Sequence, residues 1–462
     1  MRSRRTTVVT AVVALGLAAA CGSGGHQARS GAVDPPSTGA APGAAPAGAD
    51  DWPTSHQRGA RTGVAGDQAP LGTVRQAWTS PALDGKIYAQ PLLVGDRVIV
   101  ATEGDSVYAL DRGTGAVAWR ANLGSPVAGK TLPCGNIDPS GITGTPVVDA
   151  AAGTAYAVAF LADGPHHELF ALDLASGAVK WHRGVDPPGL SATVEQERAA
   201  AALSGGRVYV PYGGLAGDCG PYKGAVVSLP ADGSGDLAGW VVPTTREGGI
   251  WAPGGPVIDG GGHVWVATGN TESNSAFDYG NSVVHLDPGL RAVDYFAPAN
   301  WAALNRDDVD LGSATPTLLA DGRVFIIGKE GIGFLLDAAH LGHEGGQRFS
   351  AKVCHAGFGT AAVSAGMIYV PCVDGLVALR TGADRFAVAW RSPAVSTAAP
   401  IVAGGAVWAI DGRGTLTAYD PATGTPRFTT PLGPVTRFGS PAAARGLLVA
   451  ATGNRVVGVS LR

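Results

Sequence analysis

The sequence predicts an all-β protein, an eight-bladed β-propeller of four-stranded antiparallel blades, on three observations. A motif of Ala-x-Asp, Thr-Gly and Trp spans residues 109–119 and returns, with Ser-Gly or Phe as variants, at 171–181 and 418–428. A second element, a Pro before an apolar strand, a Gly turn and another strand, precedes it and first begins at Pro91. The chain also ends one strand short of a whole repeat. Tandem repeats of this kind indicate stacked supersecondary units, and here they decide the architecture.

Each copy of the first motif reads as a strand, a tight turn and a second strand that ends in an aromatic residue. Gly115, Gly177 and Gly424 close this turn, which needs a positive φ that glycine adopts without steric cost. We expect the aromatic side chain to dock between neighbouring sheets. The two elements together give four antiparallel strands, and a Pro at the first position of a strand removes no ladder hydrogen bond.

The repeats can be counted by their final aromatic residues: Trp119, Trp181, Trp240, Phe296, Phe349, Trp390 and Phe428. An eighth repeat begins at Ser440-Pro441 and stops at Leu461 without its last strand, and residues 73–78 offer that strand at the other end of the chain. A ring closed in this way leaves no open sheet edge. The repeat length shrinks from about 60 residues to about 40 along the chain, so we expect functional insertions in blades 2 to 5.

The N-terminus reads as an export signal followed by a tether. Residues 1–20 combine arginines, an apolar stretch and a run of alanines, which is typical of a secretory signal peptide. Cys21 follows at once and resembles a bacterial lipoprotein site, the alternative being an ordinary cleaved signal with a chance cysteine. Residues 21–50 are rich in Gly, Ala and Pro and predict a disordered tether. We therefore expect residues 51–462 to be a propeller on the outer face of the cytoplasmic membrane, held there only by a lipid anchor.

Composition excludes several classes of function. The formal net charge is −4 and no basic stripe is present, so nucleic acid is not an expected partner. Beyond the signal, no segment is apolar for long enough to span a bilayer. The chain has no Gly-x-Ser-x-Gly, His-Glu-x-x-His or phosphate-binding glycine loop, which argues against a hydrolase or a nucleotide enzyme.

Four cysteines remain after Cys21, namely Cys134, Cys219, Cys354 and Cys372. In an exported protein an even number of cysteines indicates disulfides. Cys354 and Cys372 flank one strand pair of the sixth blade, which favours a local bond and leaves Cys134 to pair with Cys219. Metal ligation by the four is the alternative, although none of them belongs to a Cys-x-x-Cys pair.

The tandem Ala-x-Asp-x-x-Thr-Gly-x-x-x-Trp motif resembles the pyrroloquinoline quinone (PQQ) repeat family from about residue 78 to residue 461. The resemblance implies the propeller fold. For function it implies two classes, because the same repeat builds quinoprotein dehydrogenases and non-enzymatic relatives such as the barrel-assembly lipoprotein of outer membranes. Function therefore has to be argued from the loops around the central funnel.

Four loop residues match cofactor segments of PQQ alcohol dehydrogenases in the same chain order. Trp251 stands where the family has the Trp that stacks on the quinone, and Asn270, in Ala-Thr-Gly-Asn, where an Asn binds calcium. Asp310, in Asp-Asp-Val-Asp, stands where the family has its catalytic base. Lys329 matches a basic residue that contacts the quinone oxygens.

Two further residues are weaker candidates, and the chain also departs from the family. Asp218 stands near the position of a calcium-binding Glu, and Glu103 is a candidate for the rim of the funnel. The adjacent Cys-Cys pair of many members is missing, and the family's usual Trp-Asp strip is replaced by Asp-Asp-Val-Asp at residues 307–310. The chain is also shorter than typical quinoprotein alcohol dehydrogenases.

The resemblance thus implies a lipid-anchored dehydrogenase that oxidises an alcohol or a sugar with PQQ and calcium. The alternative is a non-catalytic propeller lipoprotein that binds a protein or a cell-envelope polymer. The enzyme hypothesis requires one pocket to hold the side chains of Asp218, Trp251, Asn270, Asp310 and Lys329.

Overall fold

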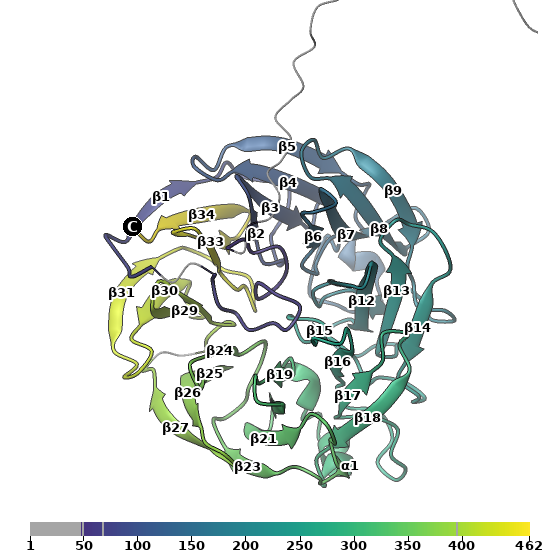
Figure 1. Cartoon of the computed structure of the whole chain (residues 1–462). Coiled ribbons are helices and arrows are strands. Elements are labelled where there is room, and N and C mark those ends of the chain that lie inside the picture. Colours follow the sequence, from purple (N-terminus) through teal and green to yellow (C-terminus); the bar gives the residue numbers. More distant parts are fainter. Residues whose placement is uncertain (1–47, 49, 67–68, 394–395) are drawn as a thin grey trace, which may run out of the picture. The chain divides into compact units, whose positions relative to one another are not determined.

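The computed structural model describes residues 48, 50–66, 69–393 and 396–462. Over this part of the chain the strands form eight antiparallel sheets arranged in a ring (Figure 1), which confirms the predicted propeller. Beside the strands lie the short helix α1 (Trp301–Arg306) and the 3-10 turns η1 (Gly129–Thr131) and η2 (Leu311–Ser313). No helix in this part of the chain has the length and apolarity needed to cross a bilayer. The predicted signal peptide, Cys21 and nearly all of the tether lie outside the described residues.

Blades 1 to 4 follow one another along the chain. Blade 1 contains β2 (Leu92–Val94), β3 (Arg97–Thr102), β4 (Ser106–Asp111) and β5 (Val117–Asn122). Blade 2 contains β6 (Val147–Asp149), β7 (Thr154–Leu161), β8 (His166–Asp173) and β9 (Val179–Gly184). Blade 3 contains β11 (Ala202–Ser204), β12 (Arg207–Gly214), β13 (Ala225–Pro230) and β14 (Ala238–Val241), with β10 (Glu195–Gln196) added beside β12. Blade 4 contains β15 (Val257–Ile258), β16 (Val264–Ala267), β17 (Val283–Leu286) and β18 (Ala292–Ala297), with β22 (His343–Glu344) parallel to β18.

Blades 5 to 8 complete the ring. Blade 5 contains β19 (Thr317–Leu318), β20 (Arg323–Ile327), β21 (Ile332–Asp337) and β23 (Phe349–Lys352). Blade 6 contains β24 (Ala362–Ser364), β25 (Met367–Cys372), β26 (Gly375–Thr381) and β27 (Phe386–Arg391). Blade 7 contains β28 (Ile401–Ala403), β29 (Ala406–Ile410), β30 (Thr415–Tyr419) and β31 (Pro426–Pro431). Blade 8 contains β32 (Ala442–Ala444), β33 (Leu447–Thr452), β34 (Arg455–Ser460) and the N-terminal β1 (Arg75–Thr79), so the predicted closure is confirmed.

At several blade junctions the aromatic residue that ends a repeat docks on the turn glycine of the next blade. The indole Nε1 of Trp119 donates a hydrogen bond to the Leu174 carbonyl at 3.1 Å. Gly177 lies against the ring, where a Cβ atom would be 2.5 Å from Cε3 of Trp119, and its φ is +75°. The turn glycine is therefore required both for its backbone conformation and for the close approach of the ring. The same contact joins the pairs Trp78–Gly115 and Trp390–Gly424.

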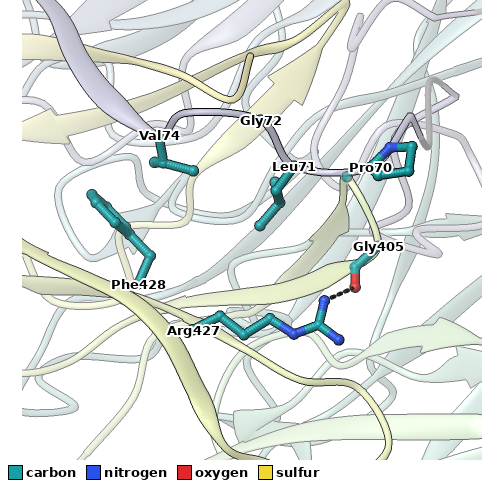
Figure 2. Close-up of a pocket in the computed structure, with 8 residues that line it drawn as sticks. Pro70, Leu71, Gly72, Val74, Gly405, Arg427 and Phe428 are labelled. Atoms are coloured by element: carbon teal, nitrogen blue, oxygen red, sulfur yellow. Dashed lines mark hydrogen bonds between the residues drawn. The ribbon is translucent and has the colours of Figure 1, made fainter.

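Phe428 meets a different surface because the two ends of the chain meet in blade 8. In the other blades the docking turn joins the third strand to the fourth, but here the third strand ends at Ser460 and the fourth begins at Arg75. An open hollow of about 600 Å³ remains beside Phe428, lined by Leu71 and Val74 among others (Figure 2). At this junction no turn joins the third and fourth strands of blade 8, and the hollow lies beside the Phe428 ring.

Residues 51–65 fill the centre of the ring and bind the innermost strands (Figure 1). This central segment makes backbone hydrogen bonds to five blades, in the pairs Trp52–Leu93, Pro53–Val148, Gly59–Ile258, Thr62–Val363 and Gly63–Val402. The guanidinium of Arg61 is buried and donates to Thr54, Ser55, Ala201 and Pro256. The free inner edges of the first strands are therefore paired by the chain itself. These residues were expected within the propeller domain, but no role was predicted for them.

Both predicted disulfides are confirmed. Cys134, in the connection from blade 1 to blade 2, is bonded to Cys219, in the loop between β12 and β13. Cys354 follows β23 and is bonded to Cys372 at the end of β25. The two cysteines are 85 residues apart in the sequence in the first bond and 18 residues apart in the second.

Candidate functional site

A cavity of about 340 Å³ lies at the end of the ring where the innermost strands begin. Its lining residues come from several blades: Tyr88, Asn136, Gln196, Arg198, Gly214, Leu215, Ala216, Asp218, Tyr222, Trp251, Asp310, Lys329, Phe358, Arg437 and Phe438. Most of them belong to the insertions of blades 2 to 5. Blades 1, 6 and 8 also contribute, through the connections that lead into them, so the functional face is wider than the insertions alone predict.

Four of the residues singled out in the sequence line this cavity, namely Asp218, Trp251, Asp310 and Lys329. Asn270 lies directly behind Asp310, and its backbone N–H donates to Asp310 Oδ1 at 2.7 Å. Glu103 does not line the cavity. It is 1% exposed and accepts hydrogen bonds from the Gly141 backbone and the Thr143 hydroxyl. Burial raises the pKa of Glu103 to about 7.

Asp310 and Lys329 form a half-enclosed ion pair in the wall of the cavity. Lys329 Nζ is 2.5 Å from Asp310 Oδ2 and 2.9 Å from Asp308 Oδ1. The side chain of Asp310 is 6% exposed and that of Lys329 24%. Burial raises the pKa of Asp310, although Lys329 and the Asn270 N–H act in the opposite direction. A buried carboxylate of this kind, held beside a cavity, is suited to accept a proton.

The opposite part of the lining is aromatic and cationic. The ring centroid of Trp251 lies 6.2 Å from those of Phe358 and Phe438. The guanidinium of Arg437 lies 5.4 Å and 5.0 Å from the same two phenyl centroids, and that of Arg198 lies 4.9 Å from Phe438. Burial lowers the pKa of Arg198 to about 10, so it stays charged at neutral pH.

The charged residues of the lining are three cations, Arg198, Lys329 and Arg437, and two carboxylates, Asp218 and Asp310. The cavity therefore combines flat apolar surfaces with a positive balance of charge. This combination fits a flat anionic ligand.

Oxygen atoms gather on the side of the cavity where Asp218 and Asp310 lie. Tyr222 donates its hydroxyl to Asp218 Oδ1 at 2.6 Å, and Asn270 Nδ2 lies 3.5 Å from Glu247 Oε2. Burial raises the pKa of Glu247, and the negative charges of Asp218 and Asp310 add to this while Arg246 opposes it. Glu247, which no sequence motif singled out, brings a further carboxylate to this group.

Four missed lining residues share one position in the repeat. Each stands four residues before the first residue of an innermost strand, and the four are Tyr88, Arg198, Phe358 and Phe438. In a propeller, equivalent repeat positions lie at the same depth around the axis. This register was readable from the repeats and is the signal that would have found them.

Comparison with known proteins agrees with the fold. The family model described as outer membrane protein assembly factor BamB matches residues 45–290 and 339–462. Quinohemoprotein alcohol dehydrogenase ADHIIG from Pseudomonas putida superposes with a TM-score of 0.69 at 13% identity, covering 89% of this chain and 80% of that one. A europium-containing methanol dehydrogenase gives 0.69 at 14% identity, covering 89% and 98%. BamB from Moraxella catarrhalis gives 0.58 at 18% identity, covering 84% and 98%. No curated protein matches the chain.

Proposed function

Because this chain belongs to the PQQ-repeat family of the outer membrane assembly factor BamB, whose fold quinoprotein dehydrogenases share, we propose that its cavity is the site of a quinoprotein-type dehydrogenase. The substrate would be an alcohol or a sugar. The observation that carries the proposal is that Trp251, Asp310 and Lys329, from three separate segments, line one cavity.

The lining fits PQQ, a flat quinone with several carboxylates. Trp251 would supply the flat surface on which the ring system rests, and Arg198, Lys329 and Arg437 would neutralise its negative charges. When bound, the quinone supplies the group that accepts a hydride from the substrate. Aromatic side chains along the wall would exclude water from the reacting atoms.

Asp310 is the residue proposed to accept the proton of the substrate hydroxyl. Its carboxylate is buried at the cavity wall and held in place by the Asn270 N–H and by Lys329. The ammonium group of Lys329 lowers the pKa of Asp310 against the larger effect of burial, and so favours the ionised carboxylate that a base requires.

Calcium is proposed to accompany the quinone, with the side-chain oxygens of Asp218 and Asn270 as its candidate ligands and Glu247, 3.5 Å from Asn270 Nδ2, as a further carboxylate beside them. Carboxylate and amide oxygens are ligands that Ca²⁺ prefers. The mutual repulsion of these carboxylates, which contributes to the raised pKa of Glu247, is a repulsion that a bound cation relieves.

The test is a calorimetric titration of the purified chain with PQQ, with and without Ca²⁺. We expect calcium-dependent binding that Trp251→Ala weakens at least about tenfold and that Trp301→Ala, on α1 outside the cavity, leaves unchanged. Asp310→Asn should retain binding but lose PQQ-dependent reduction of a dye. Absence of binding at high micromolar PQQ would exclude the dehydrogenase.

A failed titration would favour the alternative, a non-catalytic propeller lipoprotein that binds a protein or a cell-envelope polymer. The match to the assembly-factor model supports that alternative. In either role we propose that the chain acts outside the cytoplasmic membrane, held by a lipid on Cys21. Two disulfides, which persist in oxidising compartments, support the location.

A further inference from the structure

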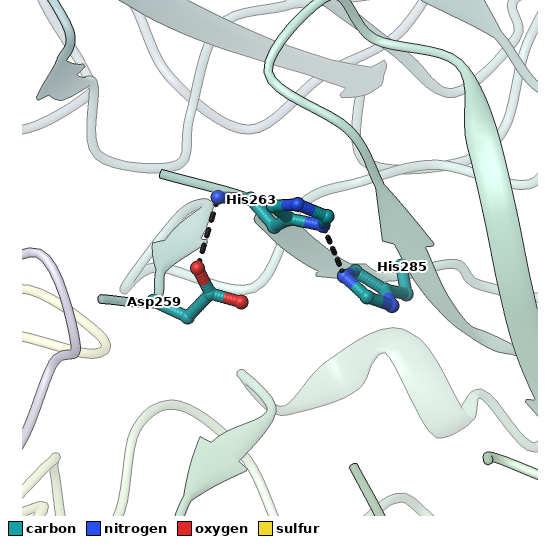
Figure 3. A group of neighbouring side chains, drawn as sticks. All are labelled: Asp259, His263 and His285. Carbon is teal, nitrogen blue, oxygen red and sulfur yellow. Dashed lines mark hydrogen bonds between the residues drawn. The ribbon is translucent and has the colours of Figure 1, made fainter. Parts of the chain in front are cut away.

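Blade 4 carries a second group of ligand-type side chains at the end opposite the cavity. Asp259 follows β15, His263 precedes β16, and His285 lies on β17. Trp251 precedes β15 on the cavity side, so this strand separates the group from the cavity. Among the described residues, one ligand atom from each of the three lies within 4.8 Å of the others (Figure 3).

The two imidazole rings face each other through single nitrogen atoms. His263 Nδ1 lies 2.7 Å from His285 Nε2 (Figure 3), so one ring donates a hydrogen and the other accepts it. Moving that hydrogen to the other nitrogen of its own ring leaves both facing nitrogens as lone-pair donors. The pair then has the electronic arrangement that a metal ion requires.

The carboxylate is held next to these rings by neighbours of its own. Asp259 Oδ1 accepts the backbone N–H groups of Gly261 and His263, and Oδ2 accepts the indole N–H of Trp265 at 3.0 Å. The Trp265 ring also stacks on His285, with centroids 3.9 Å apart and planes 10° apart. One tryptophan thus orients both the carboxylate and an imidazole, as outer-shell residues do around metal sites.

We propose that Asp259, His263 and His285 bind one divalent transition metal ion of the class of Zn²⁺. Two imidazole nitrogens and one carboxylate oxygen are a ligand set that such ions take, and all three side chains are half-buried, so water can complete the shell. Bonds of about 2.0–2.1 Å at tetrahedral angles need nitrogens about 3.3 Å apart. The rings must therefore separate by a few tenths of an ångström, and the turn of Gly260, Gly261 and Gly262 before His263 can accommodate that shift.

The charge around the site favours a cation. Asp294, which pairs with His285 across β17 and β18, brings a second carboxylate close to the ring. A bound ion would tie the first turn of blade 4 to its third strand, and this proposal does not depend on the function of the cavity.

The experiment is a Zn²⁺ titration of the tag-free, chelator-treated full chain by calorimetry, with Co²⁺ absorption as a spectroscopic check of nitrogen ligation. We expect one ion per chain and a loss of affinity of at least about tenfold in His285→Ala. His182→Ala is the matched control, because His182 also stacks on an aromatic ring and contacts a carboxylate, that of Glu168. Wild-type affinity is expected there.

Asp259→Asn provides a second variant that keeps the turn's hydrogen-bond acceptor and removes the charge, should His285→Ala not fold. It too is expected to weaken binding. No saturable binding by the wild type, or equal affinity in wild type and Asp259→Asn, would overturn the proposal and leave a cross-strand hydrogen-bonded pair with a structural role only.

Discussion

Substituting Gly177 by Ala should destabilise the ring more than the same change at Gly153 in the same blade. Both glycines have positive φ, +75° at Gly177 and +58° at Gly153. A Cβ atom at Gly177 would lie 2.5 Å, 2.8 Å and 3.1 Å from three atoms of the Trp119 ring, whereas nothing lies within 4 Å of one at Gly153. The pair separates backbone strain from steric clash.

The magnitude follows from the two contributions. An alanine forced into the left-handed region costs about 1–2 kcal/mol, which is the whole expected loss at Gly153. Overpacking against a ring that cannot move freely adds about 1–3 kcal/mol, and the Trp119 ring is fixed by its hydrogen bond to Leu174. The free energy of unfolding should therefore fall by about 2–5 kcal/mol in Gly177→Ala.

The assay is urea unfolding of both variants, with the midpoint and slope fitted separately. A second comparison repeats Gly177→Ala in a Trp119→Leu background, where the clash is removed and the extra loss should shrink to that of Gly153→Ala. Equal losses for Gly177→Ala and Gly153→Ala in the wild-type background would refute the docking argument.

Two further predictions concern the whole ring. Replacing both cysteines of the Cys134–Cys219 bond by Ser should lower the free energy of unfolding by about 4–5 kcal/mol, and the same change at Cys354–Cys372 by about 3 kcal/mol, because the first bond closes the longer loop. Calorimetric melting of both variants measures the two losses. A larger loss at Cys354–Cys372 would contradict the prediction. Burial, with the nearby charge of Glu103, raises the pKa of Asp105 from 3.8 to about 8. Between these pH values the folded chain keeps a proton that the unfolded chain has released. The free energy of unfolding should therefore fall as pH rises from about 4 to about 8. Urea midpoints at pH 5 and pH 8 should differ less in Asp105→Asn, and an unchanged difference would remove Asp105 as the cause.

The fold was predictable because the contact that joins two blades is encoded within each repeat. The docking aromatic and the turn glycine both belong to the motif, so Trp119 and Gly177 can be identified from the repeats themselves. The central segment could not be identified in this way. Residues 51–65 carry no repeat, and their conformation follows from hydrogen-bonding groups on inner strands that are far away in the sequence.

Glu103 shows where position in a repeat is not enough. It lies in the turn between β3 and β4, at the level of the funnel. The connection from blade 1 to blade 2 covers that turn, and its Gly141 and Thr143 donate to the Glu103 carboxylate. Glu103, expected at the rim of the funnel, is therefore buried, because the long connection between blades 1 and 2 covers it.

The lining of the cavity shows what repeat position adds to family resemblance. Resemblance pointed to Trp251, Asp310 and Lys329, each of which lies in a long insertion or beside one. Arg198 and Phe438 have no such local signal, yet each stands four residues before the first residue of an innermost strand, and the ring brings them into contact across blades 3 and 8. Blades 1, 3, 6 and 8 present that position to the cavity, so comparing the repeats identifies four lining residues from the sequence. The same position of the other blades, held by Thr143, Pro253, Ser313 and Thr397, does not line the cavity.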